Sequence, residues 1–136
     1  MNVKWRIWLE KDGRHVLGKG GAKILRAIEK HGSISKACKE LGMSYRFVWN
    51  YLKRMEEVLG DAVVEKERGG VERGGTKLTP LGRSLLETYE RIEKIFESAL
   101  KGVEGRVLSV EGNTAVLEVK GELEEGEKVI VLREDP

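Results

Sequence analysis

Cysteine is almost absent from this sequence of 136 residues, and long apolar runs are missing altogether. The single cysteine, Cys38, cannot form an internal disulfide and excludes a cysteine-rich zinc site, so we expect it to pack in the core. No apolar stretch approaches the roughly 20 residues that a membrane-spanning helix needs. The only histidines, His15 and His31, lack the spacing of a metal-binding pair. We therefore expect a soluble, cytoplasmic protein without a bound metal.

The residue sets that enzymes use are also missing. The sequence has no evident Ser/His/Asp or Cys/His set and no pair of acids placed for hydrolysis. We therefore expect a protein that is not an enzyme and requires no cofactor.

Charge is distributed unevenly, although the net charge is only +2. Residues 1–100 contain 20 Lys and Arg against 14 Asp and Glu, a balance of +6. Residues 101–136 contain 5 against 9, a balance of −4. A basic part followed by an acidic part indicates two modules, with polyanion contact assigned to the first. We predict one domain over residues 1–101 and a small acidic β module over residues 102–136.

Hydrophobic periodicity predicts an α+β fold that is mainly α. Residues 3–10 alternate between apolar and polar, and Asp12-Gly13 favours a tight turn, so residues 14–17 should return as a second strand. Gly18, Gly20 and Gly21 are expected to end this hairpin. Three helices should follow over residues 22–31, 34–41 and 45–59, and Ser33 and Ser44 should cap the last two.

In the second half of the chain, the spacing of apolar residues changes from that of strands to that of a helix and back again. Residues 62–79 are predicted to form a hairpin with a long glycine-rich tip. Thr79-Pro80 then favours the start of a long helix. Its apolar residues form one stripe: Leu81, Leu85, Tyr89, Ile92, Phe96 and Ala99. Three short strands are predicted near residues 105–110, 114–119 and 127–132.

Residues 33–59 have the spacing of a helix-turn-helix. Ala37 and Cys38 are small enough for a close helix crossing, and Gly42 allows the positive dihedral angle of the turn. The second helix is predicted to bury one stripe: Val48, Tyr51, Leu52, Met55 and Leu59. Its opposite face then carries a polar and aromatic set: Tyr45, Arg46, Trp49, Asn50 and Lys53.

That opposite face suggests contact with DNA. Side chains near the start of such a helix reach base edges in the major groove, where Arg46 could bind guanine and Asn50 adenine. The start of the preceding helix is placed to bind phosphate through Ser33, Ser35 and Lys36. Two alternatives stay open at this point. Tyr45 and Trp49 could be a core pair, and the cationic side chains could be ordinary solvated charges.

The glycine-rich tip, ERGGVERGGTK, is not a nucleotide-binding loop. The phosphate-loop pattern needs lysine before threonine and a helix directly afterwards, whereas here threonine precedes Lys77 and a strand follows. The tip fits the wing of a winged helix-turn-helix, in which Arg68, Arg73 and Lys77 would contact the DNA backbone or the minor groove. A merely flexible turn is the alternative.

Residues 32–92, together with the N-terminal hairpin, resemble the N-terminal domain of the molybdate-responsive transcriptional regulators, the ModE family. They resemble the LysR-type winged helix more distantly. The motifs that carry the resemblance are GSIS, GMSYRFVW, the doubled glycines and LTPLG. The likeness covers about residues 1–100 and implies a winged helix-turn-helix in which Ser44, Tyr45, Arg46, Trp49 and Asn50 lie in the recognition helix.

The resemblance also implies partners. It implies a homodimer on an inverted repeat in double-stranded DNA, with residues 79–100 making much of the dimer contact through the apolar stripe. Molybdate or tungstate is the effector that it implies. The family's usual C-terminal part is a pair of oxyanion-binding β modules, each longer than the 35 residues from Gly102 onward. Residues 102–136 resemble strands of one such module.

We therefore predict a sequence-specific DNA-binding transcriptional regulator that acts as a homodimer and has no membrane association. The alternative is a ligand-sensing or protein-interaction adaptor whose winged helix does not read DNA.

Overall fold

The computed structural model describes residues 2, 4–67, 75–102 and 104–133. Its contacts divide the chain into an N-terminal unit, residues 1–92, and a C-terminal unit, residues 93–136. The division falls inside the long helix, whereas the sequence placed the domain boundary at its end, after residue 101. No helix in the described ranges is both long enough and apolar enough to cross a membrane.

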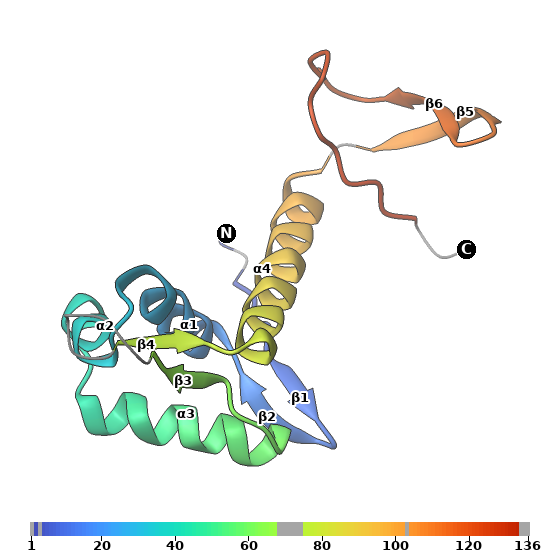
Figure 1. Ribbon diagram of the computed structural model, residues 1–136. Helices are drawn as coiled ribbons and strands as arrows, with labels where there is room; N and C mark the ends of the chain where they lie inside the picture. The colour runs from blue at the N-terminus through green and yellow to red at the C-terminus, as the bar shows by residue number, and fades with distance from the viewer. Residues whose placement is uncertain (1, 3, 68–74, 103, 134–136) are drawn as a thin grey trace. The chain divides into compact units, whose positions relative to one another are not determined.

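The N-terminal unit is the predicted winged helix-turn-helix (Figure 1). Its elements follow in the order β1 (Leu9–Lys11), β2 (Arg14–Leu17), α1 (Lys19–His31), α2 (Ile34–Leu41), α3 (Tyr45–Leu59), β3 (Val64–Lys66), β4 (Thr76–Leu78) and the start of α4 (Pro80–Lys101). Each strand pair is an antiparallel hairpin. The predicted α+β fold class is confirmed.

The N-terminal hairpin turns where the sequence predicted, at Asp12 and Gly13, whose φ angles are 51° and 74°. Its first strand begins only at Leu9, later than predicted. The predicted alternation nevertheless holds before that point, because Trp5 and Ile7 are half-buried while their neighbours are exposed.

The prediction that Gly20 and Gly21 end the hairpin is wrong, because both lie in the first turn of α1. Gly21 is buried where α1 meets β2 and α3. A Cβ atom there would lie 2.7 Å from Cβ of Leu17 and 2.8 Å from the ring of Tyr51. Glycine is thus required for a close approach rather than for a turn.

The helix ends confirm the local capping predictions. Ser33 Oγ accepts a hydrogen bond from Lys36 N at 3.3 Å, and Ser44 Oγ accepts one from Phe47 N at 3.1 Å. Gly42 adopts a left-handed conformation with φ 64° between α2 and α3. Glycine adopts this conformation at little cost in free energy, and it therefore permits the tight turn between the two helices.

The core lies where β2, α1, α2 and α3 meet, and Leu78 of β4 and Leu86 and Tyr89 of α4 complete it. Of the predicted stripe on α3, Val48, Leu52 and Met55 are fully buried, and Tyr51 and Leu59 are half-buried. Cys38 is buried as predicted, and this burial raises the pKa of its thiol.

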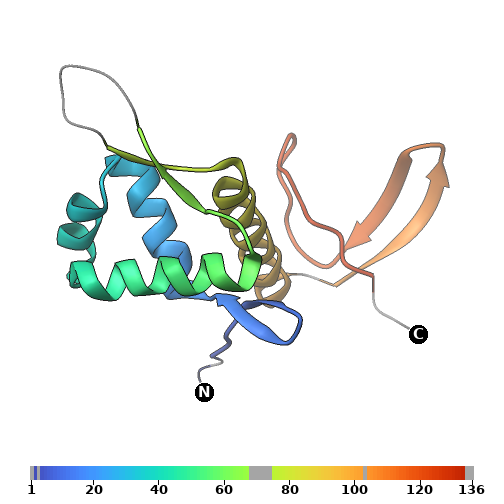
Figure 2. The ribbon, with the colours of Figure 1, turned by 60° about the horizontal axis from the view of Figure 1, so that its bottom comes forward.

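The wing strands run from the end of α3 toward α2 and back to the start of α4 (Figure 2). Their register pairs Glu65 with Lys77 and Lys66 with Thr76. Thr76 N donates to Gly32 O at 2.8 Å, which ties β4 to the turn between α1 and α2. The strands of the predicted wing are therefore fixed near its tip; the tip itself, residues 68–74, lies outside the described residues.

The LTPLG motif joins the wing to α4. Thr79 N donates to Val63 O at 3.0 Å, and Thr79 Oγ1 donates to Ala62 O at 2.7 Å. The same hydroxyl caps α4 by accepting from Gly82 N at 3.1 Å. Thr79 thus fulfils its predicted capping role, and it also holds Ala62 and Val63, the two residues that lead into β3.

Two ion pairs connect α4 to α1 within the N-terminal unit. Arg26 Nε lies 2.8 Å from Glu90 Oε1, and Arg83 Nε lies 3.3 Å from Glu29 Oε1. Because the charges are arranged reciprocally, they favour one alignment of the two helices. Their partial exposure means that each contributes little to stability on its own.

In the described part of the C-terminal unit, β5 (Gly105–Glu111) and β6 (Thr114–Val119) form a hairpin. The prediction of a third strand over residues 127–132 is wrong, because these residues do not pair with β5 or β6. Only the turn before them is present, with Glu127 N donating to Glu124 O at 3.1 Å. Alternation reveals a segment's amphipathic character but not a pairing partner, and a strand requires both.

Candidate nucleic-acid interface

The beginning of α3 carries exposed side chains that the core does not use. Tyr45 is 50% exposed and Trp49 is 39% exposed, and Arg46 and Asn50 are exposed beside them. Tyr45 and Trp49 are therefore not a core pair, because the opposite side of α3 supplies the core contacts. The first two turns of α3 are free to contact a partner.

A ladder of contacts runs along one edge of this surface. The rings of Tyr45 and Trp49 are stacked, with centroids 6.3 Å apart and planes inclined by 13°. Lys53 Nζ lies 4.5 Å from the centroid of the Trp49 ring, a cation–π contact. Lys53 therefore holds the aromatic pair in place from the next helical turn.

Glu56 connects this ladder to the wing. One of its carboxylate oxygens lies 2.9 Å from Lys53 Nζ, and the other accepts a hydrogen bond from Val63 N at 3.1 Å. The exposed surface at the beginning of α3 and the base of the wing at Val63 are thus linked through the side chain of Glu56. Sequence periodicity gives no sign of this link.

The beginning of α2 lies next to α3. Ser35 and Lys36 are exposed there, and Ser33 is half-buried while it caps the helix. Lys36 and Arg46 form no ion pair with any other residue that the structure describes. Their charges remain available to an anionic partner.

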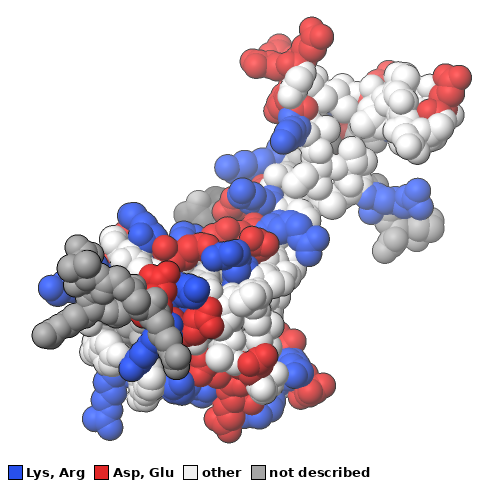
Figure 3. All heavy atoms as spheres, in the orientation of Figure 1, with Lys and Arg blue, Asp and Glu red and all other residues white. Residues whose placement is uncertain are grey.

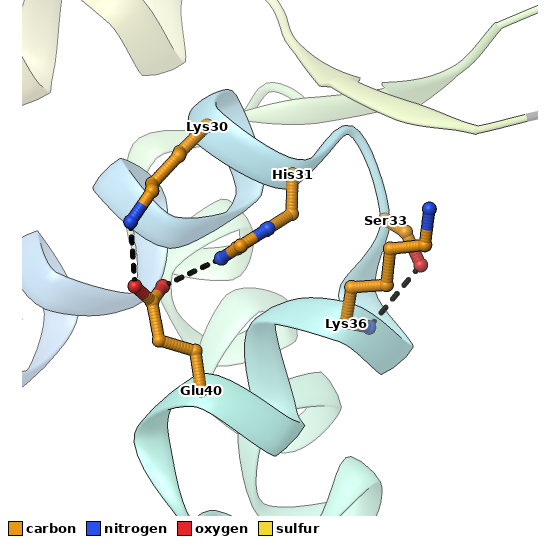
Figure 4. A network of polar contacts seen from close by, with 5 residues as sticks. All are labelled: Lys30, His31, Ser33, Lys36 and Glu40. Carbon is orange, nitrogen blue, oxygen red and sulfur yellow. Dashed lines mark hydrogen bonds and ion pairs between the residues drawn. The ribbon is translucent and has the colours of Figure 1, made fainter.

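A clamp of polar contacts joins α1 to α2 (Figure 4). Glu40 lies 2.9 Å from Lys30 Nζ and 2.8 Å from His31 Nε2. The hydrogen bonds from Lys30 and then His31 hold the pKa of Glu40 below its ordinary value. The carboxylate is therefore charged at neutral pH and available to Lys30.

A hollow of about 430 Å³ lies where the two helix starts meet the wing. It is lined by Ser33, Ile34, Ser35, Tyr45, Lys66, Gly75 and Thr76. Hydroxyl groups and one lysine thus surround a space beside the beginning of α2, where backbone N–H groups favour an anion. Sequence analysis missed Lys66, although its position just before the glycine-rich tip could have indicated it.

The predicted wing residues have different surroundings. Lys77 is exposed but lies 3.6 Å from Glu65 on the paired strand, so part of its charge is already compensated. Arg68 and Arg73 lie outside the described residues.

The charge of α2 and of the first part of α3 is mainly positive. Residues 33–55 contain five Lys and Arg and one acidic residue, Glu40, which is already paired inside the protein. In Figure 3, Lys and Arg side chains project around the beginning of α3, whereas Asp and Glu side chains gather nearer its end. The favourable potential for a polyanion thus coincides with the exposed aromatic surface.

The apolar stripe of α4 is only partly on the surface. Leu81 and Leu85 are half-buried against the core, and Tyr89 is 1% exposed, with its hydroxyl 3.5 Å from Ile7 O. Tyr89 therefore packs inside its own chain rather than at a surface. Farther along the helix, Ile92 is half-buried, Phe96 is 44% exposed and Ala99 is exposed.

Comparison with known proteins shows which class of domain the N-terminal unit is similar to. The bacterial regulatory helix-turn-helix proteins of the lysR family match residues 21–83. Those residues run from α1 through α2, α3 and the wing to the first turn of α4. The helix-turn-helix and wing of the N-terminal unit are therefore similar to the lysR-type helix-turn-helix domain.

Individual relatives are more specific. The chain is 33% identical over 107 residues to the molybdenum transport protein ModE of Azotobacter vinelandii, which covers 79% of this chain and 40% of that protein. It is 39% identical over 87 residues to the molybdenum-pterin-binding protein MopB of Rhodobacter capsulatus. This alignment covers 64% of this chain and 32% of that protein. It is 33% identical over 76 residues to the DNA-binding transcriptional dual regulator ModE of Escherichia coli K12. This alignment covers 56% of this chain and 29% of that protein.

The chain thus carries a ModE-like N-terminal winged helix-turn-helix domain, as its sequence motifs indicated. It spans between about three tenths and two fifths of the length of these curated relatives.

Proposed function

We propose that this chain is a sequence-specific DNA-binding transcriptional regulator. The observation that carries the proposal is the exposed beginning of α3, where Arg46 and Asn50 stand beside two exposed aromatic rings. The opposite side of the helix is buried at Val48, Leu52 and Met55. A helix of this class inserts its first turns into the major groove. Arg46 would then donate to guanine O6 and N7, and Asn50 would pair with adenine.

Phosphate contacts would surround these base contacts. The backbone N–H groups and hydroxyls at the start of α2, with Lys36, would hold one phosphate at the hollow beside the wing. Lys66 lines the same hollow and would act with them. Arg68, Arg73 and Lys77 of the wing would contact the adjacent backbone or minor groove, and Lys53 would contact the backbone from α3.

Replacing Lys36 with alanine tests the phosphate role. We expect it to weaken binding to every duplex alike and to reduce the slope of log K against log salt by about 0.9, the value for one neutralised phosphate. Fluorescence anisotropy over a salt series measures both quantities. Lys120→Ala removes the same charge from the C-terminal unit and should leave the slope unchanged. Equal slopes for wild type and Lys36→Ala would contradict the assignment.

We also propose that the regulator acts as a homodimer on an inverted repeat. The exposed part of the α4 stripe supports this, because Phe96 and Ala99 continue the apolar line that starts at the core. Antiparallel or parallel pairing of two such helices would bury the stripe.

Changing Phe96 to glutamate should convert the dimer into a monomer, because a charge would be buried at the helix pair. Sedimentation velocity should then give a mass near 15.3 kDa instead of about twice that value. Lys94→Glu places a new acid on the opposite side of α4 and should leave the dimer intact. A monomeric wild type would refute the homodimer without touching the DNA-binding proposal.

A link to molybdate or tungstate is the third part of the proposal. It rests on the relatives, two of which are called a molybdenum transport protein and a molybdenum-pterin-binding protein. Repeating the DNA titrations with molybdate, tungstate and sulfate tests it. A change in affinity with the first two anions and not with sulfate supports the link, and identical curves with all three exclude it.

A further inference from the structure

Phe47 is an exposed aromatic residue that neither the core nor the predicted interface uses. It lies in the first turn of α3 and is 50% exposed. In the described part of the N-terminal unit, only three other large hydrophobic side chains are comparably exposed: Trp8, Tyr45 and Trp49. Three of these four side chains thus gather at the start of the recognition helix, which is an unusual use of apolar surface.

The direction of Phe47 differs from that of the other two rings. With about 100° per residue, Phe47 follows Asn50 around the helix by about 60°, on the side away from Tyr45 and Trp49. Arg46 and Asn50 therefore lie between an aromatic pair on one edge and Phe47 on the other. A groove that receives Arg46 and Asn50 would also receive Phe47.

The ring of Phe47 is supported from behind. It lies against Tyr51, with centroids 6.2 Å apart and planes inclined by 57°. Tyr51 is half-buried, and its hydroxyl lies 3.3 Å from His15 Nε2 on the N-terminal hairpin. Phe47 is therefore packed on one side against Tyr51, which lowers the entropic cost of a contact.

The chemistry of Phe47 restricts its partner on DNA. Tyr45 and Trp49 each carry a polar atom that can bind phosphate or a base edge, whereas Phe47 has none. The apolar group that base pairs present in the major groove is the C5-methyl of thymine, and phenylalanine is a suitable contact for it. We infer that Phe47 contacts a thymine methyl group and so determines a thymine in the half-site, close to the bases that Arg46 and Asn50 contact.

This inference depends on the proposed DNA-binding function, and substitution of deoxyuridine for thymidine tests it separately. The probe is the duplex selected from random DNA by the wild type, with deoxyuridine replacing one thymidine at a time. Only the methyl group is removed by this change. We expect one position in each half-site at which the wild type loses about fourfold in affinity, the value of one buried methyl group.

Phe47→Ala should bind the thymidine and deoxyuridine duplexes equally at that position, whereas Phe47→Leu should keep most of the difference. Because Phe47 lies outside the core, its variants should melt like the wild type, which circular dichroism checks. Trp8→Ala is the matched control: Trp8 is also 50% exposed, and its removal should leave the deoxyuridine effect unchanged.

Two results would overturn the inference. Either the wild type is insensitive to deoxyuridine at every position, or Phe47→Ala retains the full sensitivity. Both results are compatible with tight, selective DNA binding and so leave the proposed function in place. Failure to select any sequence at all would instead remove the proposed function.

Discussion

Gly82→Ala is expected to lower the free energy of unfolding by about 3 kcal/mol, although it adds only one methyl group. Gly82 lies in the first turn of α4, where a Cβ atom would collide with the carbonyl oxygen of Val63 and lie 3.3 Å from Val63 Cα. These neighbours are backbone atoms and cannot rotate away as a side chain can. Moving them would also disturb the hydrogen bonds of Thr79 to Val63 and Ala62.

Urea unfolding followed by circular dichroism measures this effect. Gly20→Ala is the matched control, because Gly20 lies in the first turn of α1 and a Cβ atom there meets nothing within 4 Å. Alanine should be neutral or stabilising at that position, by up to about 1 kcal/mol. If both variants unfold at the same urea concentration, the close approach of α4 to Val63 is not a constraint on the fold.

Arg46→Ala has the largest effect that we expect on DNA recognition. Loss of a bidentate contact to guanine should cost about 1–3 kcal/mol on the selected sequence. On random DNA the loss should be much smaller, because there the side chain supplies only its charge. The ratio of the two affinities, measured by anisotropy at one salt concentration, should therefore fall by about tenfold or more.

Lys36→Ala supplies the comparison, since we assign Lys36 to phosphate. It should lower both affinities by the same factor and leave their ratio unchanged. If Arg46→Ala shows this same pattern, Arg46 contacts the backbone and does not read a base.

The sequence predicted best those features that depend on neighbouring residues. The caps of Ser33, Ser44 and Thr79 involve hydrogen bonds across three positions, and the Asp12-Gly13 turn is set by its own two residues. The two faces of α3 follow from its period. Each of these signals is local, so the residues alone were sufficient to identify it.

Features that depend on distant contacts were missed. Nothing in the sequence indicates that Glu56 holds Val63 N, that Gly75 and Thr76 lie against Gly32, or that α1 begins before Gly20. The strand predicted over residues 127–132 was wrong for the same reason, because its existence depended on a pairing partner.

The candidate site was predicted only in part. The exposed residues of α3 followed from subtracting the core stripe, but Phe47 lies between the two faces and was counted in neither. Lys66 was missed although its position before the glycine-rich tip marks it as a wing residue, because its place in the hollow beside α2 depends on the register of the wing strands.

Selection of bound sequences from random DNA, carried out in parallel with the wild type and Arg46→Ala, decides whether the outer flank of α3 recognises nucleotides. We expect the wild type to enrich two inverted half-sites and the variant to lose one guanine from each of them. Motifs that are the same for both proteins, or no enrichment by the wild type, would contradict sequence recognition by α3 and favour an adaptor that does not read DNA.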